Sequence, residues 1–144
     1  MNVERVKFAD FNIAIDVTGA GVGGQAYRIY QAAFNRVPDA GGVGFWISQM
    51  DNGTSLKDVA GGFVGSAEFK SIYGNSPTNA QIVDKLYQNV LHRAGESGGV
   101  AFWKGILDSH GATVPEVLAA FSESPENQAA LIGVIGNGFV YTPY

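Results

Sequence analysis

One phrase occurs twice in the chain and holds the side chains best suited to chemistry. Residues 35–46 read NRVPDAGGVGFW, and residues 92–103, which lie 57 positions further on, read HRAGESGGVAFW. Each copy contains an arginine, whose planar guanidinium suits carboxylate ligands, and a tryptophan, whose face suits sugars or peptides. With the acid of each copy, the candidate ligand or partner contacts are Arg36, Asp39, Trp46, Arg93, Glu96 and Trp103.

The same phrase has a structural interpretation, which we favour. Each arginine is expected at the end of one helix and each acid at the start of the next, where both complement the helix macrodipoles and can pair with each other. A glycine pair, at 41–42 and at 98–99, allows two helices to approach. Because aromatic side chains at helical spacing more often fill a core than form a site, the phrase predicts a helix-turn-helix corner made twice.

A glycine-rich segment matches the fingerprint of dinucleotide-binding loops. Gly19, Gly21 and Gly24 give the pattern G-x-G-x-x-G between an expected strand and an expected helix. A dinucleotide-binding unit then requires a second parallel strand that ends in an acid about 20 residues further on. Here that interval is helical in pattern and contains the first corner, so we interpret the glycines as a flexible strand-to-helix connection.

The residues available for catalysis form no coherent set. The chain has no cysteine, and His92 and His110 are not spaced as zinc ligands. The LDSHG stretch around His110 is interpreted as a helix end with Gly111 as the left-handed cap. A hydrolase that uses Asp39 and Glu96 is a third hypothesis, but both acids lie at capping positions, so the sequence predicts no enzyme.

An acidic loop for calcium is the remaining metal candidate. The segment 50–55, MDNGTS, resembles the start of such a loop, but the twelfth position counted from Asp51 is Gly62, where calcium loops place glutamate. We interpret the segment as a turn between two helices. The residues themselves therefore predict neither a metal site nor another cofactor.

The composition fits one globular domain and excludes some partners. A chain of 144 residues, 46% hydrophobic and 15% charged, has ample material for one core. Nine basic residues are scattered through a chain of net charge −4, so no basic stripe is available for nucleic acid. Charges near the N-terminus interrupt any secretory signal there, and no apolar run approaches the roughly 20 residues of a membrane span.

Periodicity predicts a mainly α chain that begins with a β-hairpin. Residues 11–17 alternate apolar and polar side chains, and residues 6–8 form a shorter strand before them. From Gln25 onward the apolar spacing becomes that of helices. A lone hairpin is only marginally stable in water, so this one is expected to dock on the helical part.

The helical part divides into two related units of several short helices. Two units are too few for an open solenoid, so they are expected to pack around one shared core. In the second unit, Thr78 or Asn79 is expected to cap the first helix and Ser124 the last. The predicted single domain, 1–144, comprises a β-hairpin (1–18), helical repeat one (23–76), helical repeat two (77–135) and a C-terminal tail (136–144).

The doubled pattern resembles a bacterial family, domain of unknown function 4214. Its members repeat a Tyr-Gln, Arg-x-Pro-Asp, Gly and aromatic-Trp series followed by Ser-x-Glu-Phe, and the resemblance covers about residues 25–135. The first copy matches at Tyr30, Gln31, Arg36, Pro38, Asp39, Gly42, Trp46 and 66–69. The second copy keeps Tyr87, Gln88, Arg93, Gly99 and Trp103, but has Ala94, Gly95 and Glu96 in place of the Pro-Asp element.

This resemblance implies an exported protein. Such domains are frequent in large surface-layer and adhesin-like proteins that carry hemolysin-type (RTX) calcium-binding repeats and leave the cell by type I secretion. Residues 5–19 look like the strands that follow the last such repeat, so the resemblance implies calcium in the neighbourhood, although the nonapeptide itself is absent here. The apolar segment 131–144 is either part of a C-terminal secretion signal or the last helix and an extended end.

The expected function is a non-enzymatic structural or interaction module of a type I-secreted bacterial protein that is located outside the cell or at its surface. Its expected partner is a protein or a cell-surface polymer. The alternative is a glycan- or peptide-binding module that uses the repeated Arg and Trp corners. The strand at 6–8 has no upstream partner, so its edge also predicts a homodimer.

Overall fold

Eight helices form most of the described part of the chain, as the periodicity predicts. The computed structural model describes residues 5–144, and helices account for 61% of these residues. The first repeat consists of α1 (Val22–Phe34), α2 (Ala40–Asp51), α3 (Leu56–Val64) and α4 (Ala67–Tyr73). The second consists of α5 (Asn79–Val90), α6 (Ser97–Asp108), α7 (Val114–Ser122) and α8 (Pro125–Ile135). The four helices of one repeat thus recur in the same order in the other.

Short polar side chains determine where most of these helices begin. Thr78 accepts a hydrogen bond from the backbone of Gln81, whose side chain bonds back to Thr78, so α5 starts with a capping box. Ser124 caps α8, Pro125 is its first residue and Glu126 lies in its first turn. These caps confirm the predicted boundaries, and the two last helices of the repeats start alike because Ser66 caps α4 in the same way.

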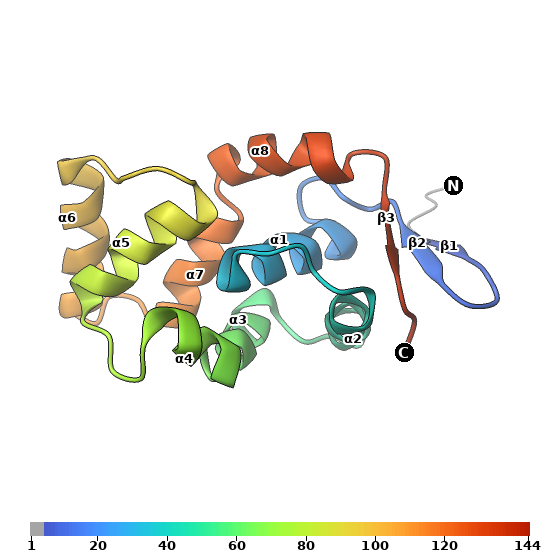
Figure 1. Ribbon diagram of the computed structural model, residues 1–144, viewed down its shortest axis with the longest axis horizontal. Coiled ribbons are helices and arrows are strands. Elements are labelled where there is room, and N and C mark those ends of the chain that lie inside the picture. The colour runs from blue at the N-terminus through green and yellow to red at the C-terminus, as the bar shows by residue number, and fades with distance from the viewer. Residues whose placement is uncertain (1–4) are drawn as a thin grey trace.

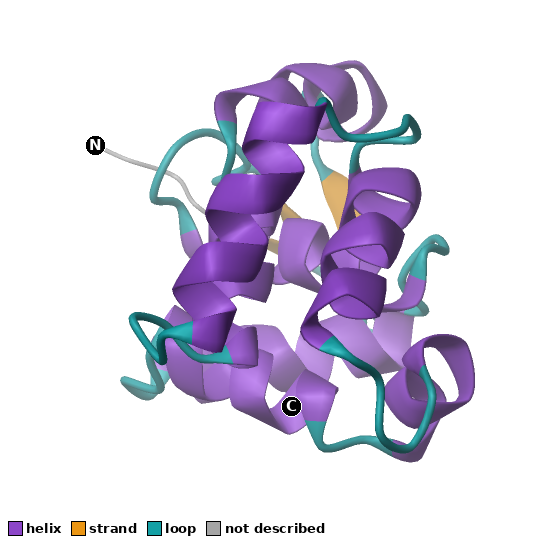
Figure 2. Ribbon diagram, turned by 90° about the vertical axis from the view of Figure 1, so that its left-hand side faces the viewer, coloured by secondary structure: helices purple, strands orange, loops and turns teal. Residues whose placement is uncertain are grey.

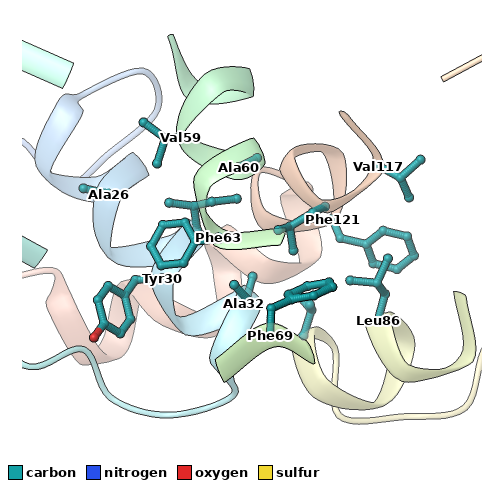
Figure 3. Packing of buried hydrophobic residues seen from close by; sticks show 14 of the residues in the cluster. Ala26, Tyr30, Ala32, Val59, Ala60, Phe63, Phe69, Leu86, Val117 and Phe121 are labelled. Carbon is teal, nitrogen blue, oxygen red and sulfur yellow. The ribbon is translucent and has the colours of Figure 1, made fainter. Parts of the chain in front are cut away.

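Both repeats contribute to one main core. In Figure 3, Phe63 of α3 and Phe121 of α7 lie in this core, with Tyr30 of α1 beside Phe63 and Leu86 of α5 near Phe121. The aromatic rings of Tyr30 and Phe63 meet edge to face at 5.3 Å. A smaller apolar cluster of Val17, Tyr27 and Ile135 lies apart from it. The shared core agrees with the predicted packing of two repeats face to face.

The predicted hairpin is present, but it is part of a larger sheet. Strands β1 (Arg5–Lys7) and β2 (Asn12–Ala14) pair antiparallel, and β3 (Phe139–Tyr141) pairs antiparallel with the free side of β2. The strand expected over residues 11–17 is therefore shorter than its alternating pattern. Residues 136–144, expected as a tail, supply the third strand. Two contacts hold this strand in place: Tyr141 is buried, and the backbone N–H of Thr142 donates to the carbonyl of Ala40, 3.0 Å away.

The sheet lies against α2, at one end of the molecule. Figure 1 shows β3 and α2 together at that end and α6 at the opposite end, and Figure 2 shows the strands behind the helices of the second repeat. An added Cβ at Gly44 of α2 would collide with the carbonyl oxygen of Thr142, so only glycine permits this approach of helix and strand. The second repeat has Ala101 at the equivalent position of α6, where the side chain is exposed.

An ion-pair cluster holds the hairpin in place. The guanidinium of Arg5 on β1 contacts the carboxylates of Asp16 and Asp51, each at 2.8 Å. Asp16 also accepts from the backbone N–H of Gly23 in the first turn of α1, 2.9 Å away. The cluster therefore connects the sheet both to the start of α1 and to the end of α2.

The glycine-rich connection before α1 has a structural role. An added Cβ at Gly24 would meet the carbonyl of Val17, so the chain packs tightly there. Arg28 of α1 is only 2% exposed and donates to the carbonyls of Val17 and Gly19 at 2.9 and 2.7 Å. The carbonyl groups of the glycine-rich connection are thus bound by Arg28, a side chain of the same protein.

Both histidines adopt the left-handed backbone conformation. His92 has φ 56° and His110 has φ 57°, and the equivalent positions of the first repeat are Asn35 at φ 51° and Gly53 at φ 102°. The prediction that Gly111 is the left-handed cap of α6 is therefore wrong by one residue. Helix α6 ends at Asp108, and in the turn that follows it His110 adopts the left-handed conformation, which is unfavourable for a residue with a side chain. The first repeat has Gly53 at the equivalent position.

We expect His110→Gly to raise the free energy of unfolding by about 1 kcal/mol, because a non-glycine residue in this conformation costs about 1–2 kcal/mol. The reverse change in the first repeat, Gly53→Ala, is expected to lower it by about 1 kcal/mol. Urea denaturation followed by circular dichroism measures both. A destabilising His110→Gly substitution would contradict the strain.

Candidate functional site

In the first corner, the predicted arginine and acid come together. Asp39 is the N-cap of α2 and accepts from the backbone N–H of Gly42 at 2.7 Å. Arg36 contacts Asp39 at 3.4 Å, and it makes a closer two-point contact with Glu68 of α4, at 2.7 and 3.1 Å. The hydroxyl of Tyr30 donates to Asp39 and accepts from Arg36 at 2.9 Å. One arginine thus connects the corner to the start of α4.

The second corner repeats this arrangement at equivalent positions. Arg93 contacts Glu96, the N-cap residue of α6, at 2.7 Å and makes a two-point contact with Glu126 of α8 at 3.0 and 2.9 Å. Its guanidinium lies 5.3 Å from the ring centre of Tyr87, as that of Arg36 lies 5.0 Å from Tyr30. Glu96 makes no side-chain cap bond, because the longer glutamate turns to the arginine instead.

Each arginine is therefore held by two carboxylates and a tyrosine ring. Bonds from Tyr30, from the Gly42 amide and from Arg36 lower the pKa of Asp39, and Arg93 lowers the pKa of Glu126. Glu68 raises the pKa of Arg36, and Glu126 raises that of Arg93. These groups are charged at neutral pH and already satisfied by one another.

The two tryptophans pack along the inner side of their helices. Trp46 lies 4.9 Å, ring centre to ring centre, from Phe63, and Trp103 lies 5.3 Å from Phe121. Both indoles are partly exposed. Each contacts the exposed ring of the phenylalanine that precedes it in the sequence, Phe45 or Phe102. The arginines stack on tyrosines rather than on these indoles, so arginine and tryptophan do not form one joint platform.

Sequence reasoning missed four members of the two clusters. Tyr30, Tyr87, Glu68 and Glu126 complete the arginine contacts. Their signal was present in the repeated pattern, because each tyrosine precedes its arginine by six residues and each glutamate follows a capping serine by two. The two tyrosines and Glu68 were interpreted as family markers, and Glu126 as a residue that suits the helix dipole.

The corners can hold helices together. Each corner also has a glycine against its tyrosine ring: a Cβ at Gly42 would lie 2.8 Å from Tyr30, and one at Gly99 would collide with the hydroxyl of Tyr87. Ring, glycine and ion pair together fix the angle between the first and second helix of each repeat. Such an arrangement can act as a joint between helices.

Acid is expected to destabilise the protein through these carboxylates. The folded-state pKa values of Asp39, Glu96 and Glu126 lie below their ordinary values of 3.8 and 4.5, so the unfolded chain takes up protons first as pH falls. Their stabilisation is therefore present above those ordinary values and is lost below them. Urea midpoints measured from neutral pH to about pH 3 should fall in this window. An Arg36→Gln, Arg93→Gln double variant should show a shallower fall, and an unchanged fall would contradict this origin.

Other site types find no support in the described part of the chain. Within residues 5–144, no three His, Asp or Glu side chains are grouped so as to hold a metal ion. Asp51 ends α2, and the residues after it form the turn between α2 and α3, as interpreted from the sequence. None of the helices within the same residues is long and apolar enough to cross a membrane.

Comparison with known families places the chain. The family described as "Domain of unknown function (DUF4214)" matches residues 26–72 and 60–131, in two overlapping matches. Comparison with curated proteins and with solved structures gives no match. The two matches cover both corners, and the matched residues make up well over half of the 144-residue chain. The chain therefore belongs to the DUF4214 family.

Proposed function

We propose that this chain is a non-enzymatic structural and interaction module of an exported, surface-associated bacterial protein. The observation that supports this most is the use of the repeated polar residues within the fold. Arg36 and Arg93, the best candidate ligand contacts, are each engaged by two carboxylates, so the geometry that both repeats share can position helices. Export, type I secretion and the RTX neighbourhood rest on the resemblance to exported relatives.

A second copy of the chain is the partner that we propose for the sheet. Strand β1 is at one edge of the sheet, whose order is β1-β2-β3. On the face of the sheet that points away from α2, the three strands place an apolar row of paired residues, Val6, Ile13 and Val140. Val140 is 52% exposed. Phe8 and Phe11, stacked at 4.8 Å in the turn, extend this exposed surface. An open edge beside an apolar face favours strand pairing between copies.

The solution mass of the chain tests this partner. We expect twice the 15.2 kDa of one chain for the unaltered protein, measured by sedimentation equilibrium. Val6→Lys should yield monomers, since a charge on a short edge strand opposes pairing. Val37→Lys is the matched control, because Val37 is 73% exposed but lies in the first corner, and it should stay dimeric.

A monomer at every concentration would contradict the dimer. The same measurements with calcium chloride and with EDTA separate a role of calcium in assembly from one in neighbouring segments. We expect the same mass in both solutions, because within residues 5–144 no carboxylates are grouped to hold a metal ion.

The alternative proposal is a glycan- or peptide-binding module that uses the two corners. Its support is the partial exposure of Trp46 and Trp103 beside the exposed rings of Phe45 and Phe102. A saturable change in tryptophan emission with a surface glycan, lost in Trp46→Phe, would favour it. An unresponsive spectrum would leave the corners as structural joints.

A further inference from the structure

We propose that a cavity between the sheet and α2 binds one neutral saccharide unit. The cavity measures about 340 Å³, at the lower end of the size range of small-molecule sites. It contains none of the six corner residues predicted from the sequence. The lining residues that carry the proposal are Lys7, Asn12, Ser48, Asp51, Tyr141 and Tyr144.

One face of the sheet supplies a polar row to this cavity. Lys7, Asn12 and Tyr141 are paired neighbours on the three strands, so they form a line across the sheet. Asn12 and Tyr141 are 6% and 4% exposed, and the Asn12 amide donates to the Tyr141 hydroxyl at 3.2 Å. This bond leaves the carbonyl oxygen of Asn12 as an acceptor and the hydroxyl hydrogen of Tyr141 as a donor. A buried donor and acceptor side by side match the paired hydroxyls of a sugar ring.

The opposite wall comes from α2 and is held rigidly. Both oxygens of Asp51 accept from Arg5, at 2.8 and 3.2 Å, and Arg5 is fixed in turn by Asp16. Each Asp51 oxygen retains a lone pair for a ligand hydroxyl. Ser48, one turn earlier on α2, adds a further hydroxyl to the same wall. The acceptors are thus positioned before a ligand arrives, which reduces the entropy that binding would otherwise lose.

The aromatic part of the site is Tyr144. Its ring is 73% exposed, lines the cavity and meets Phe45 edge to face at 5.9 Å. An accessible ring beside a row of planar polar groups is the combination that sugars require, because their C–H face is apolar and their edge is hydroxylated. A simple apolar ligand would leave the carbonyl oxygen of Asn12 and the hydroxyl hydrogen of Tyr141 without partners, which is unfavourable.

The charges around the cavity favour a neutral ligand. Arg5 and Lys7 bring two positive charges, and Asp16 and Asp51 bring two negative ones. These charges cancel, so a ligand with a net charge gains little over a neutral polyol. The lining supplies both donors and acceptors, which a sugar hydroxyl can satisfy in either direction.

The second repeat lacks this site, which provides matched controls. The positions equivalent to Ser48, Asp51 and Asn52 on α6 are Gly105, Asp108 and Ser109, and all three are exposed. Asp108 is paired there with Lys104 at 2.6 Å. The cavity therefore results from the sheet, which covers only one of the two repeats.

The inference deepens the proposed function, because it names a ligand class for an interaction module. The experiment is a heteronuclear NMR titration of the full chain with the methyl glycosides of glucose, galactose, mannose and N-acetylglucosamine. Glucuronate serves as the charged probe. We expect a neutral glycoside to shift the Asn12 side-chain amide and the Ser48 backbone amide, with a dissociation constant on the order of millimolar.

Variants make the result specific to the cavity. Tyr144→Ala and Ser48→Ala should each weaken binding about tenfold or abolish it. Phe102→Ala, an exposed ring of the second repeat, and Ser109→Ala should leave it unchanged. Resonances of the core report in the same spectra whether each variant is folded.

Three results would overturn the proposal: no shift with any neutral glycoside, shifts that persist in folded Tyr144→Ala, or shifts with glucuronate alone. The last would assign an anion to Lys7. The solution mass measured without sugar tests the proposed assembly separately. Loss of the saccharide site would therefore leave the assembly proposal standing, and a monomeric chain would leave the saccharide result standing.

Discussion

Replacing Arg28 with alanine is expected to lower the free energy of unfolding by about 3–5 kcal/mol, the cost of breaking a buried ion pair by removing one partner. Arg28 on α1 is 2% exposed and donates to both oxygens of Glu123, at 2.5 and 3.1 Å. Glu123 follows α7, so this pair joins the first repeat to the second. Without the arginine, Glu123 keeps a partly buried charge and two carbonyls of the glycine-rich connection lose their donor.

The duplication provides the control for this substitution. Lys85 occupies the equivalent position of α5 and makes one hydrogen bond, to the carbonyl of Ile72 at 2.5 Å. Lys85→Ala is therefore expected to cost about 1.5 kcal/mol. Chemical denaturation of both variants gives the two values, provided that the free energy of unfolding depends on denaturant concentration with the same slope in each.

A double variant separates charge from packing at the same place. Arg28→Met with Glu123→Leu removes both charges, and it should recover much of the loss, because a buried ion pair can often be exchanged for apolar contacts. An Arg28→Ala variant as stable as Lys85→Ala would show that the pair contributes little. The connection between the repeats would then depend on the apolar core alone.

Replacing Gly44 with valine is expected to release β3 from α2 and to cost about 2–3 kcal/mol, in the upper part of the range for overpacking. A side chain at Gly44 collides with the backbone of Thr142, which no rotamer change can relieve. The strand must therefore move, and Tyr141, now 4% exposed, would become accessible. Hydrogen exchange should show faster exchange at the Thr142 amide, which donates to the carbonyl of Ala40 in the unaltered protein.

The equivalent change in the second repeat is the matched control. Ala101 on α6 is exposed, so Ala101→Val should cost only about 0.5 kcal/mol of helix propensity. Equal effects of the two valines would mean that β3 does not depend on the close approach at Gly44. The comparison also tests the saccharide cavity, because a displaced β3 removes its polar row.

The helices were predictable because their signals are local. The start of α8 is specified by three consecutive residues, Ser124, Pro125 and Glu126. The buried stripe of a helix follows from the spacing of its apolar residues, and this spacing occurs in both repeats. The arginine and acid of each corner were predicted as a pair for the same reason, since three residues separate them. Local rules and a repeated pattern were sufficient for these elements.

The sheet, the buried arginine and the cavity were not predictable in the same way. Strand β3 has only three residues, so its alternation is too short to distinguish from an extended end. The burial of Arg28 was not predictable because arginines are rarely buried. Its partner, Glu123, lies 95 positions away in the sequence. The cavity needs β1, β3 and α2 together, and no single segment carries its pattern.

The third strand also determines when the molecule can finish folding. Asn12 and Tyr141, which bond across the sheet, are 129 positions apart, whereas Arg28 and Glu123, which join the two repeats, are 95 positions apart. Contacts at such separation form late, since a long loop must close before they contribute. During synthesis β1 and β2 are made before the helices, but β2 can pair with β3 only after α8 has been made. Completion of the sheet therefore follows formation of the helices, and an early folding intermediate should contain the helices without the third strand.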